Sequence, residues 1–401
     1  MIFVLVFALS ACEENSPPAA VRLMAIPAAA GSMAPNLARG PHGGLVLSWV
    51  EPDGAGHVLR FSVLGIAGWA APRTIARGNS WFVNWADFPS VVPLSGDLWA
   101  AHWLQSQPDG GYAYDVKITM SNDNGETWSE AFLPHFDGTP TEHGFVTLFP
   151  DGNGLGLVWL DGRKMINDFD ANDVGASGMT LRAATFGIDQ APTTSALVDD
   201  LTCDCCQTDL ALTDDGPVVV YRNRTEEEVR DIYVSRREAG KWQDGVAVAS
   251  DNWEMPACPV NGPIIRANGS NVAVAWFTAA DDRPRVQAAW SRDAARTFSE
   301  PLQVSTERPL GHVGAVLLAN GDLVVSWQQG TGGGKAALML RRVSSAGEMS
   351  APYRLQEAVD IFSFSVPQLA LAGNEVVVVW TTSVNNVYGV HGAVLPLDVL
   401  D

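Results

Sequence analysis

Seven residues, GDLVVSW at positions 321–327, recur in variant form along the whole chain. Each copy begins with a turn residue and continues as an apolar run that ends in an aromatic side chain. The copies are GGLVLSW (43–49), GDLWAAHW (96–103), GLGLVW (154–159), GPVVVY (216–221), NVAVAW (271–276), GDLVVSW (321–327) and NEVVVVW (374–380). Their spacing of roughly 50 to 60 residues is close to the length of a four-stranded propeller blade. The sequence therefore predicts an all-β protein, a single β-propeller with four-stranded antiparallel blades.

A second apolar segment precedes most of the copies and predicts the innermost strand of each blade. These segments are PNLA (35–38), PSVV (89–92), DLAL (209–212), PII (263–265) and PQLALA (367–372). The seven copies favour seven blades. Only about one more strand, at 387–397, follows Trp380, so the last blade is one strand short. We expect AAVRLMAIP (19–27) to supply the missing outer strand and to close the ring.

The composition agrees with this fold and excludes one class of partner. Apolar residues make up 47% of the chain and charged residues 17%, which suits many short strands joined by tight turns. The formal net charge of −20 repels phosphate backbones, and no stretch alternates basic with aromatic residues. Nucleic acid is therefore not an expected partner, and we expect a monomer.

The N-terminus predicts export. Residues 1–11 form an apolar run that is too short to cross a bilayer as a helix and reads as a signal peptide. Leu9-Ser10-Ala11-Cys12 resembles the lipobox of bacterial lipoproteins, which implies a lipid on Cys12, a tether at 12–18 and a propeller at 19–401. The expected location is the periplasm or the outer cell surface of a bacterium. A buried first strand with an incidental cysteine is the alternative.

The sequence SNDNGETW at 121–128 matches the Asp-box pattern Ser-x-Asp-x-Gly-x-Thr-Trp at every fixed position. SRDAARTF (291–298) and SRREAGKW (235–242) are degenerate copies at the same place in other repeats. With the Trp repeat, the chain resembles the sialidase and BNR-repeat propellers over nearly its whole length. The resemblance keeps six blades as an alternative, and it implies structural turns opposite the ligand face. The residues concerned are Ser121, Asp123, Gly125, Thr127, Trp128, Ser291, Asp293 and Phe298.

The resemblance leaves catalysis open. Sialidases of this kind hold the substrate carboxylate with three arginines, the first in an Arg-Ile-Pro motif, and use a Tyr nucleophile paired with Glu and an Asp acid/base. Here the strand starts read MAPNLA and DFPSVV, without that Arg, and no Tyr–Glu pair is identifiable. If the protein is a hydrolase, Asp161 and Asp209 are the candidate carboxylate pair.

Polar residues are predicted to gather on the face opposite the Asp-boxes, where propellers of this kind bind ligands. They are His143, Asp161, Arg163, Arg222, Arg224, Asn261, Thr278 and His312. Arg163 with Arg222 or Arg224 would clamp a carboxylate, sulfate or phosphate. The alternative is that these arginines pair with the many acidic residues at the surface.

Four cysteines are predicted to meet at the same face. Cys203, Cys205 and Cys206 precede one blade, and Cys258 precedes the next. In an exported protein they form disulfides, for which three pairings exist, or a thiolate site beside His143 for Cu(I) or Zn(II). Three functional hypotheses follow: an exported propeller that binds or hydrolyses an anionic small molecule or glycan, a thiol-rich metal-binding or redox propeller, and a scaffold for protein partners.

Overall fold

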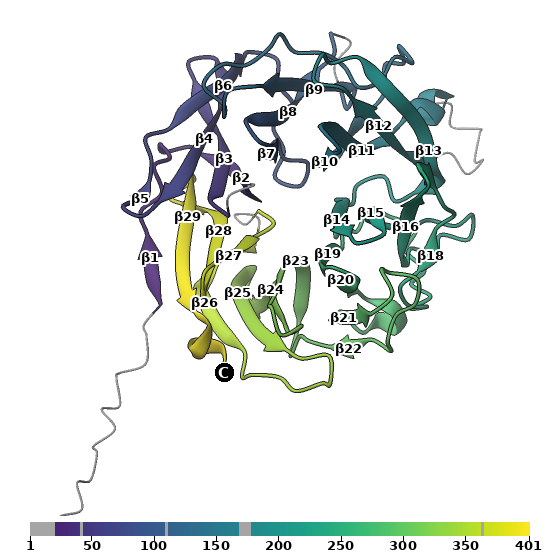
Figure 1. The fold of residues 1–401 in the computed structure, drawn as a ribbon. Coiled ribbons are helices and arrows are strands. Elements are labelled where there is room, and N and C mark those ends of the chain that lie inside the picture. The colour runs from purple at the N-terminus through teal and green to yellow at the C-terminus, as the bar shows by residue number, and fades with distance from the viewer. Residues whose placement is uncertain (1–20, 41–42, 109–110, 168–177, 362–364) are drawn as a thin grey trace, which may run out of the picture.

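Short antiparallel sheets stand around a central axis, each with its first strand innermost (Figure 1). The structure, a computed structural model, describes residues 21–401 except 41–42, 109–110, 168–177 and 362–364. The chain is an all-β, seven-bladed propeller of four-stranded antiparallel sheets, so the predicted fold class is confirmed and the six-bladed alternative is wrong. The predicted signal peptide (1–11), Cys12 and the tether (12–18) lie outside the described residues.

The blades follow one another along the chain. Blade 1 contains β2 (Met33–Arg39), β3 (Leu45–Asp53), β4 (Gly56–Gly65), β5 (Gly68–Trp69) and β6 (Arg73–Gly78). Blade 2 contains β7 (Ser90–Ser95), β8 (Leu98–Ser106) and β9 (Tyr114–Ser121), and a bridge between Ile118 and Phe132 stands in the place of its fourth strand. Blade 3 contains β10 (His143–Asp151), β11 (Gly154–Asp161), η1 (Arg163–Asn167), β12 (Met179–Phe186) and β13 (Pro192–Thr202).

The second half of the ring repeats this order. Blade 4 contains β14 (Asp209–Thr213), β15 (Gly216–Arg222), β16 (Ile232–Glu238), β17 (Lys241–Trp242) and β18 (Val246–Ala247). Blade 5 contains β19 (Ile264–Asn268), β20 (Asn271–Thr278), η2 (Ala280–Asp282), β21 (Arg285–Ser291) and β22 (Leu302–Gln303). Blade 6 contains β23 (Pro309–Leu317), β24 (Leu323–Gly332), β25 (Lys335–Val343) and β26 (Tyr353–Asp360). Blade 7 contains β27 (Gln368–Ala372), β28 (Glu375–Val384), β29 (Val387–Pro396) and β1 (Arg22–Met24), with η4 (Leu397–Leu400) after them.

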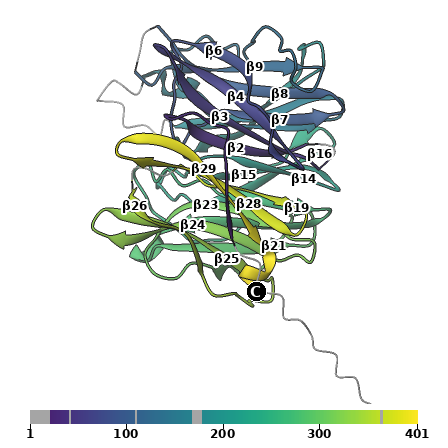
Figure 2. The ribbon, with the colours of Figure 1, turned by 90° about the vertical axis from the view of Figure 1, so that its left-hand side faces the viewer.

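The ring is closed by the N-terminal strand, as the sequence predicts. β1 pairs antiparallel with β29, with Arg22 opposite Val394 and Met24 opposite Gly392. β28 and β29 also lie beside β2 and β3 of blade 1 (Figures 1 and 2). Both ends of the chain therefore contribute to one closed ring. None of the helices in the described part of the chain has the length and hydropathy needed to span a membrane.

The aromatic residues that end the repeats form the core between blades. Trp49, Trp159, Trp276, Trp327 and Trp380 have at most 1% of their surface exposed. Truncating a buried Trp to Ala typically costs about 3 to 5 kcal/mol. These side chains therefore stabilise the packing of neighbouring blades, and none of the five is available to stack against a ligand.

Two of the three Asp-box-like stretches form the same turn. Ser121 donates to Asp123 at 2.7 Å, and Asp123 accepts from the amide and hydroxyl of Thr127 at 2.9 and 2.6 Å. Ser291, Asp293 and Thr297 repeat these bonds at 2.7, 2.9 and 2.7 Å. The third stretch, 235–242, has Arg237 in place of the Asp and forms the β16–β17 hairpin instead.

Candidate functional site

The connections that enter each blade, and those from second to third strands, emerge on one face because antiparallel strands alternate in direction. This face carries the β13–β14 connection with Cys203, Cys205 and Cys206, and the β18–β19 connection with Cys258. The Asp-box turns follow third strands, so they lie on the opposite face. The cysteines thus come from consecutive blades.

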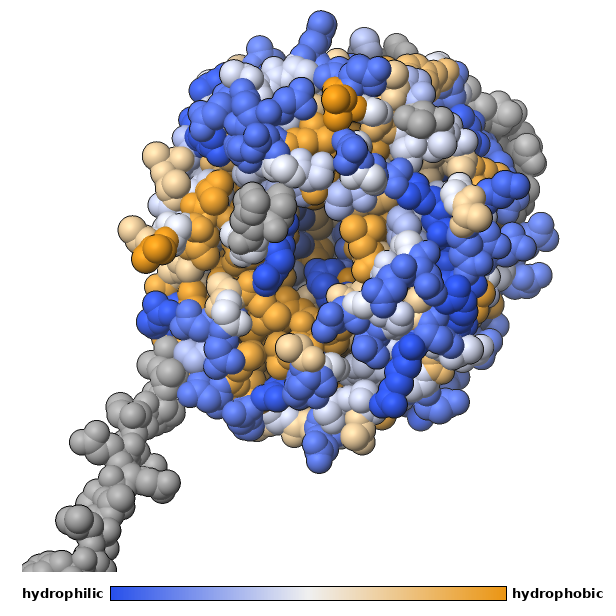
Figure 3. Space-filling model, viewed as in Figure 1, coloured by the Kyte–Doolittle hydropathy of each residue, from blue (hydrophilic) through white to orange (hydrophobic). Residues whose placement is uncertain are grey.

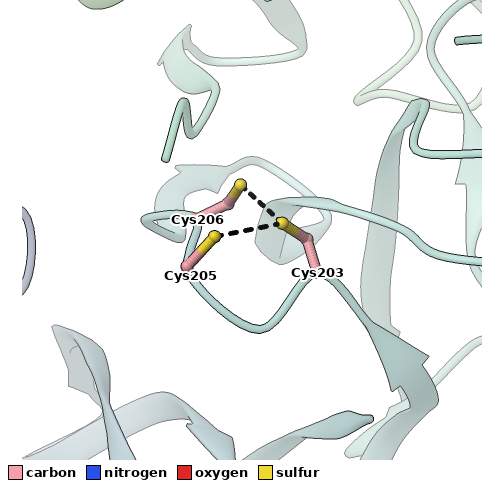
Figure 4. Close-up of side chains that lie close together, drawn as sticks. All are labelled: Cys203, Cys205 and Cys206. Atoms are coloured by element: carbon pink, nitrogen blue, oxygen red, sulfur yellow. Dashed lines mark hydrogen bonds between the residues drawn. The ribbon is translucent and has the colours of Figure 1, made fainter. Parts of the chain in front are cut away.

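The sulfur atoms of the first three cysteines point toward one another (Figure 4). The Cys203 sulfur lies 2.6 Å from that of Cys206 and 4.0 Å from that of Cys205. Cys258 comes from the connection that enters the next blade, and its side chain interacts with that of Cys205. All four thiols are free in this structure. Cys203 and Cys206 are buried, Cys205 is half-buried and Cys258 is exposed.

Hydrogen bonds to blades 3 and 4 and to the connections that enter blades 2 and 5 hold the loop that carries these thiols. The Cys203 amide donates to the Arg222 carbonyl at 3.0 Å, and the Met179 amide donates to Asp204 at 2.9 Å. Gln207 donates to the Ala86 carbonyl at 2.7 Å and accepts from the Gly262 amide at 3.0 Å. The loop is therefore fixed at both of its ends.

The charges around the cluster favour one thiolate. Arg230 is buried and donates to the Cys203 sulfur at 3.4 Å. Burial opposes ionisation of Cys203, but hydrogen bonds from the Cys205 and Cys206 thiols and the charge of Arg222 hold its pKa well below the usual range. The hydrogen bond to Cys203 raises the pKa of Cys205, and burial raises that of Cys206. A thiolate flanked by two thiols is able to ligate a metal ion or to act as a nucleophile.

The arginines of the predicted anion clamp are all engaged with the protein itself. Buried Arg222 donates to the carbonyls of Asn261, Phe277 and Arg230 at 2.6 to 3.0 Å and lies over the Trp253 ring. Arg224 pairs with Glu228 at 2.6 Å and Asp204 at 2.9 Å. Arg163 binds Asp161 with two bonds of 2.6 Å. Arg163 shares none of these partners with Arg222 or Arg224.

His143 belongs to a second group, separate from the thiols. Its Nε2 atom lies 3.2 Å from Asp137 and 3.8 Å from Asp161, and its ring stacks on that of His135 with centroids 3.9 Å apart. Asp137 and His135 come from the β9–β10 connection, which the sequence analysis did not single out. The pKa of Asp161 is lowered because its bonds to Arg163 outweigh its burial. The group is therefore a buried polar network built around the ion pair of Arg163 with Asp161.

The two candidate catalytic carboxylates each have their own arginine. Asp161 pairs with Arg163, and Asp209 accepts from Arg266 at 2.6 Å and from the Ile265 amide at 2.8 Å. An acid/base pair needs one carboxyl group that stays protonated near neutral pH. The bonds to Arg163 lower the pKa of Asp161, and Asp209 is held by Arg266 and the Ile265 amide, so these contacts do not support that role.

A third group, also missed from the sequence, contains a tyrosine between two carboxyl groups. The Tyr114 hydroxyl lies 2.9 Å from Asp87 and 2.6 Å from Glu142. The hydroxyl can donate only one hydrogen bond. The second contact therefore requires that one of the two carboxyl groups is protonated and donates to the tyrosine oxygen. Burial raises the pKa of Asp87 and of Glu142 to about 7. Burial also raises the pKa of Tyr114, whose side chain has no exposed surface. A buried tyrosine that resists ionisation is a poor nucleophile.

The remaining predicted residues, Asn261, Thr278 and His312, are not among the residues that line the central cavity. This cavity has a volume of about 630 Å³ and is lined by the inner strands, with Asp87 and Asp209 on its wall. Figure 3 shows a hollow at the centre of the ring with apolar side chains around it. Asn261 accepts from the His312 amide at 2.7 Å, and the His312 ring lies 4.9 Å from that of Trp85. Buried Thr278 accepts from the Ala280 amide.

The chain is similar to solved structures, but it matches no known sequence family. No protein-family model and no curated protein sequence matches the chain. A protein of unknown function from Dyadobacter fermentans is 12% identical with a TM-score of 0.49, covering 92% of this chain and 95% of its own. The likeness is one of fold.

Glycoside hydrolases are among the other similar structures. An α-L-arabinofuranosidase from Fusarium graminearum is 13% identical with a TM-score of 0.48, over 92% of this chain and 94% of its own. A Trypanosoma rangeli sialidase is 11% identical with a TM-score of 0.49, over 84% of this chain and 57% of its own. At these identities the comparison concerns the architecture and not the site.

Proposed function

We propose that this protein is an exported, lipid-anchored propeller that binds a soft metal ion, Cu(I) or Zn(II), through its cysteine cluster. The observation that carries the proposal is that one ligand sulfur from each of Cys203, Cys205 and Cys206 lies within 4.8 Å of the others. Thiolates are the ligands that Cu(I) and Zn(II) prefer. Cys258, on the connection that enters the next blade, would supply the fourth ligand.

The sulfur distances suit a shared ion after a small movement. With metal–sulfur bonds of about 2.3 Å, two thiolates on a tetrahedral ion lie about 3.8 Å apart. The Cys203 and Cys205 sulfurs are 4.0 Å apart, while Cys206, at 2.6 Å from Cys203, must move outward. Three or four thiolates around such an ion leave a net negative charge, which Arg230 beside Cys203 offsets.

Metal uptake by the reduced protein tests this function. Protein purified without oxygen should bind about one Cu(I) or Zn(II) per chain, measured by metal analysis and by competition with a chelator. Cys203→Ser and Cys205→Ser should each lower the affinity by at least about tenfold, because each removes a ligand. Ala257→Ser, at an exposed position beside Cys258, is the control and should bind like the parent. Reduced protein that takes up neither ion would contradict the proposal.

Binding of an anionic small molecule or glycan in the central cavity is the second candidate function. The cavity of about 630 Å³ is within the range typical of ligand sites, and Asp87, Gln207 and Arg266 place polar groups on its wall. Ligand-observed NMR with sialic acid, on the parent and on Arg266→Met, tests it. Saturation transfer that is strong in the parent and lost in the variant is the expected result. Equal signals from both proteins would contradict binding in the cavity.

A further inference from the structure

The four thiols form a path from the surface to the interior. Cys258 is exposed, Cys205 is half-buried, and Cys203 and Cys206 are buried. The Cys205 sulfur is 4.0 Å from that of Cys203, and the Cys203 sulfur is 2.6 Å from that of Cys206. Cys258 lies on the β18–β19 connection at the entry to the next blade, and its side chain interacts with that of Cys205. A metal site requires only that the sulfur atoms lie close together. The graded burial of the four thiols is therefore an additional property of the cluster.

Disulfide exchange requires direct access of one sulfur to another. A disulfide in solution can approach Cys258, whereas Cys203 and Cys206 have at most 2% of their surface exposed. We propose that the cluster is also a thiol–disulfide relay, in which a small-molecule disulfide reacts at Cys258 and the oxidation passes through Cys205 to the buried pair Cys203 and Cys206. The inference concerns the thiols of the proposed metal site, but it does not require the ion.

Each step of the relay is an ordinary exchange. The Cys258 thiolate attacks the external disulfide, forming a mixed disulfide and releasing one thiolate. Cys205 loses its proton and attacks the Cys258 sulfur, which forms Cys205–Cys258 and releases the second external thiolate. The Cys203 thiolate then attacks Cys205 and frees Cys258. Finally Cys206, after losing its proton, attacks Cys203, which forms Cys203–Cys206 and frees Cys205. Two electrons move outward, and one external disulfide becomes two thiols.

The order of transfer follows from the contacts. The vicinal pair Cys205–Cys206 would close a small strained ring, so Cys203 is the preferred partner of Cys205. The loop that carries the buried pair is fixed by Gln207 and by the Cys203 amide, which keeps these sulfurs in reach of one another. A bound metal ion would hold the thiolates and stop the relay, so the relay is an activity of the metal-free protein.

The test uses reduced, metal-free full-length protein and bis(2-hydroxyethyl) disulfide, a neutral probe that the net charge of −20 does not repel. Samples are quenched with acid and alkylated at intervals, and the disulfides are mapped by mass spectrometry. In the parent, Cys205–Cys258 should appear first and Cys203–Cys206 later. Cys203→Ser should stop at Cys205–Cys258, and Cys206→Ser should stop at Cys203–Cys205.

The deciding variant is Cys258→Ser, which changes an exposed side chain and should keep the thermal stability of the parent. It should form Cys203–Cys206 at least about tenfold more slowly, while Ala257→Ser should match the parent. Formation of Cys203–Cys206 at the parent rate in Cys258→Ser, or before any reaction at Cys258 in the parent, would overturn the relay. Metal binding is measured on the same reduced samples. A protein that binds no metal ion can therefore be distinguished from one that lacks the relay.

Discussion

Two turns with the same hydrogen bonds carry different residues at the position that requires a left-handed backbone. Gly125 has φ +76° and Ala295 has φ +64°, and the amide of each donates to the first Ser of its turn at 2.8 and 2.9 Å. Glycine adopts this conformation without cost, whereas an L-residue pays about 1 kcal/mol. A Cβ atom at Gly125 would also lie 2.8 Å from the Phe61 ring.

Exchanging these residues should therefore have unequal effects. Gly125→Ala should lower the free energy of unfolding by about 1 to 3 kcal/mol, from backbone strain and the clash with Phe61. Ala295→Gly should change it by less than about 0.5 kcal/mol, because relief of strain offsets the larger entropy of the unfolded chain. Urea unfolding of both variants measures the difference. Equal losses at the two positions would show that the Phe61 contact does not matter.

The carboxyl groups around Tyr114 should make stability depend on pH. The pKa of Asp87 is about 7 in the folded protein and about 3.8 when unfolded, because burial favours the protonated form. Between pH 4 and 7 the folded protein therefore binds more protons than the unfolded chain, and stability falls as the pH rises through this window. Above pH 7 this contribution is constant.

Asp87→Asn removes one of these titrating groups. Between pH 5 and pH 8, the titration of Asp87 should lower the free energy of unfolding of the parent by about 2 to 3 kcal/mol. This part of the loss should be absent in the variant. Denaturant unfolding at both pH values measures this difference. The control is Asp97→Asn, at an exposed turn far from the cavity, which should keep the slope of the parent. If Asp87→Asn also keeps that slope, the shared proton is not located on Asp87.

At the scale of elements, one short strand has a large role. β1 has three residues, yet it covers the outer edge of β29 and completes the last blade. Without it, β29 would present unpaired main-chain groups, which favour aggregation. The closure thus joins residues that are more than 360 positions apart in the chain, such as Arg22 and Val394.

Removing this strand should open the ring. A chain that begins at residue 28 should melt at a lower temperature than one that begins at residue 19, and it should aggregate on heating. Calorimetry and light scattering compare the two. The chain that begins at residue 19 retains β1 and should melt like the full-length protein. Equal melting temperatures for the chains beginning at residues 19 and 28 would mean that pairing of β1 with β29 contributes nothing to stability.

At the scale of the whole molecule, the ring brings separate loops to one face. The connections that enter blades 4 and 5 carry the four thiols on that face, although Cys206 and Cys258 are 52 positions apart in the sequence. The first strand of the chain, β1, lies at the outer edge of the ring, away from the central cavity (Figure 1). A tether before β1 would therefore leave the cavity open to solvent.

The proposed anchor depends on one residue. Cys12→Ser should release the protein from membranes and leave its stability unchanged, because the lipid is attached at this thiol alone. Membrane fractionation of cells that express the parent and the variant measures the release. Ser10→Ala keeps a small residue before the cysteine and should stay with the membrane. Detergent-dependent membrane association of Cys12→Ser would refute the lipid anchor.

The repeat around Trp327 favoured seven blades and predicted five of their inner strands and the closing strand. This worked because strands and turns follow from local alternation and turn chemistry, and because a repeat places each copy in an equivalent position. The same phasing placed Cys258 and the other three cysteines on connections that enter consecutive blades. Features that depend on the regular order of strands and turns within a blade could therefore be predicted from the sequence.

Side-chain partners were decided only by the tertiary structure. Arg222 appeared available for an anion, but it donates to three main-chain carbonyls, of Asn261, Phe277 and Arg230. Tyr114 had no visible partner, yet Asp87 and Glu142 reach its hydroxyl from other connections. Hydrogen bonds and ion pairs act over about 3 Å, while loops of irregular length determine which groups come that close. The courses of these loops do not follow from any periodic pattern in the sequence. The hydrogen-bond and ion-pair partners are therefore known only from the folded ring.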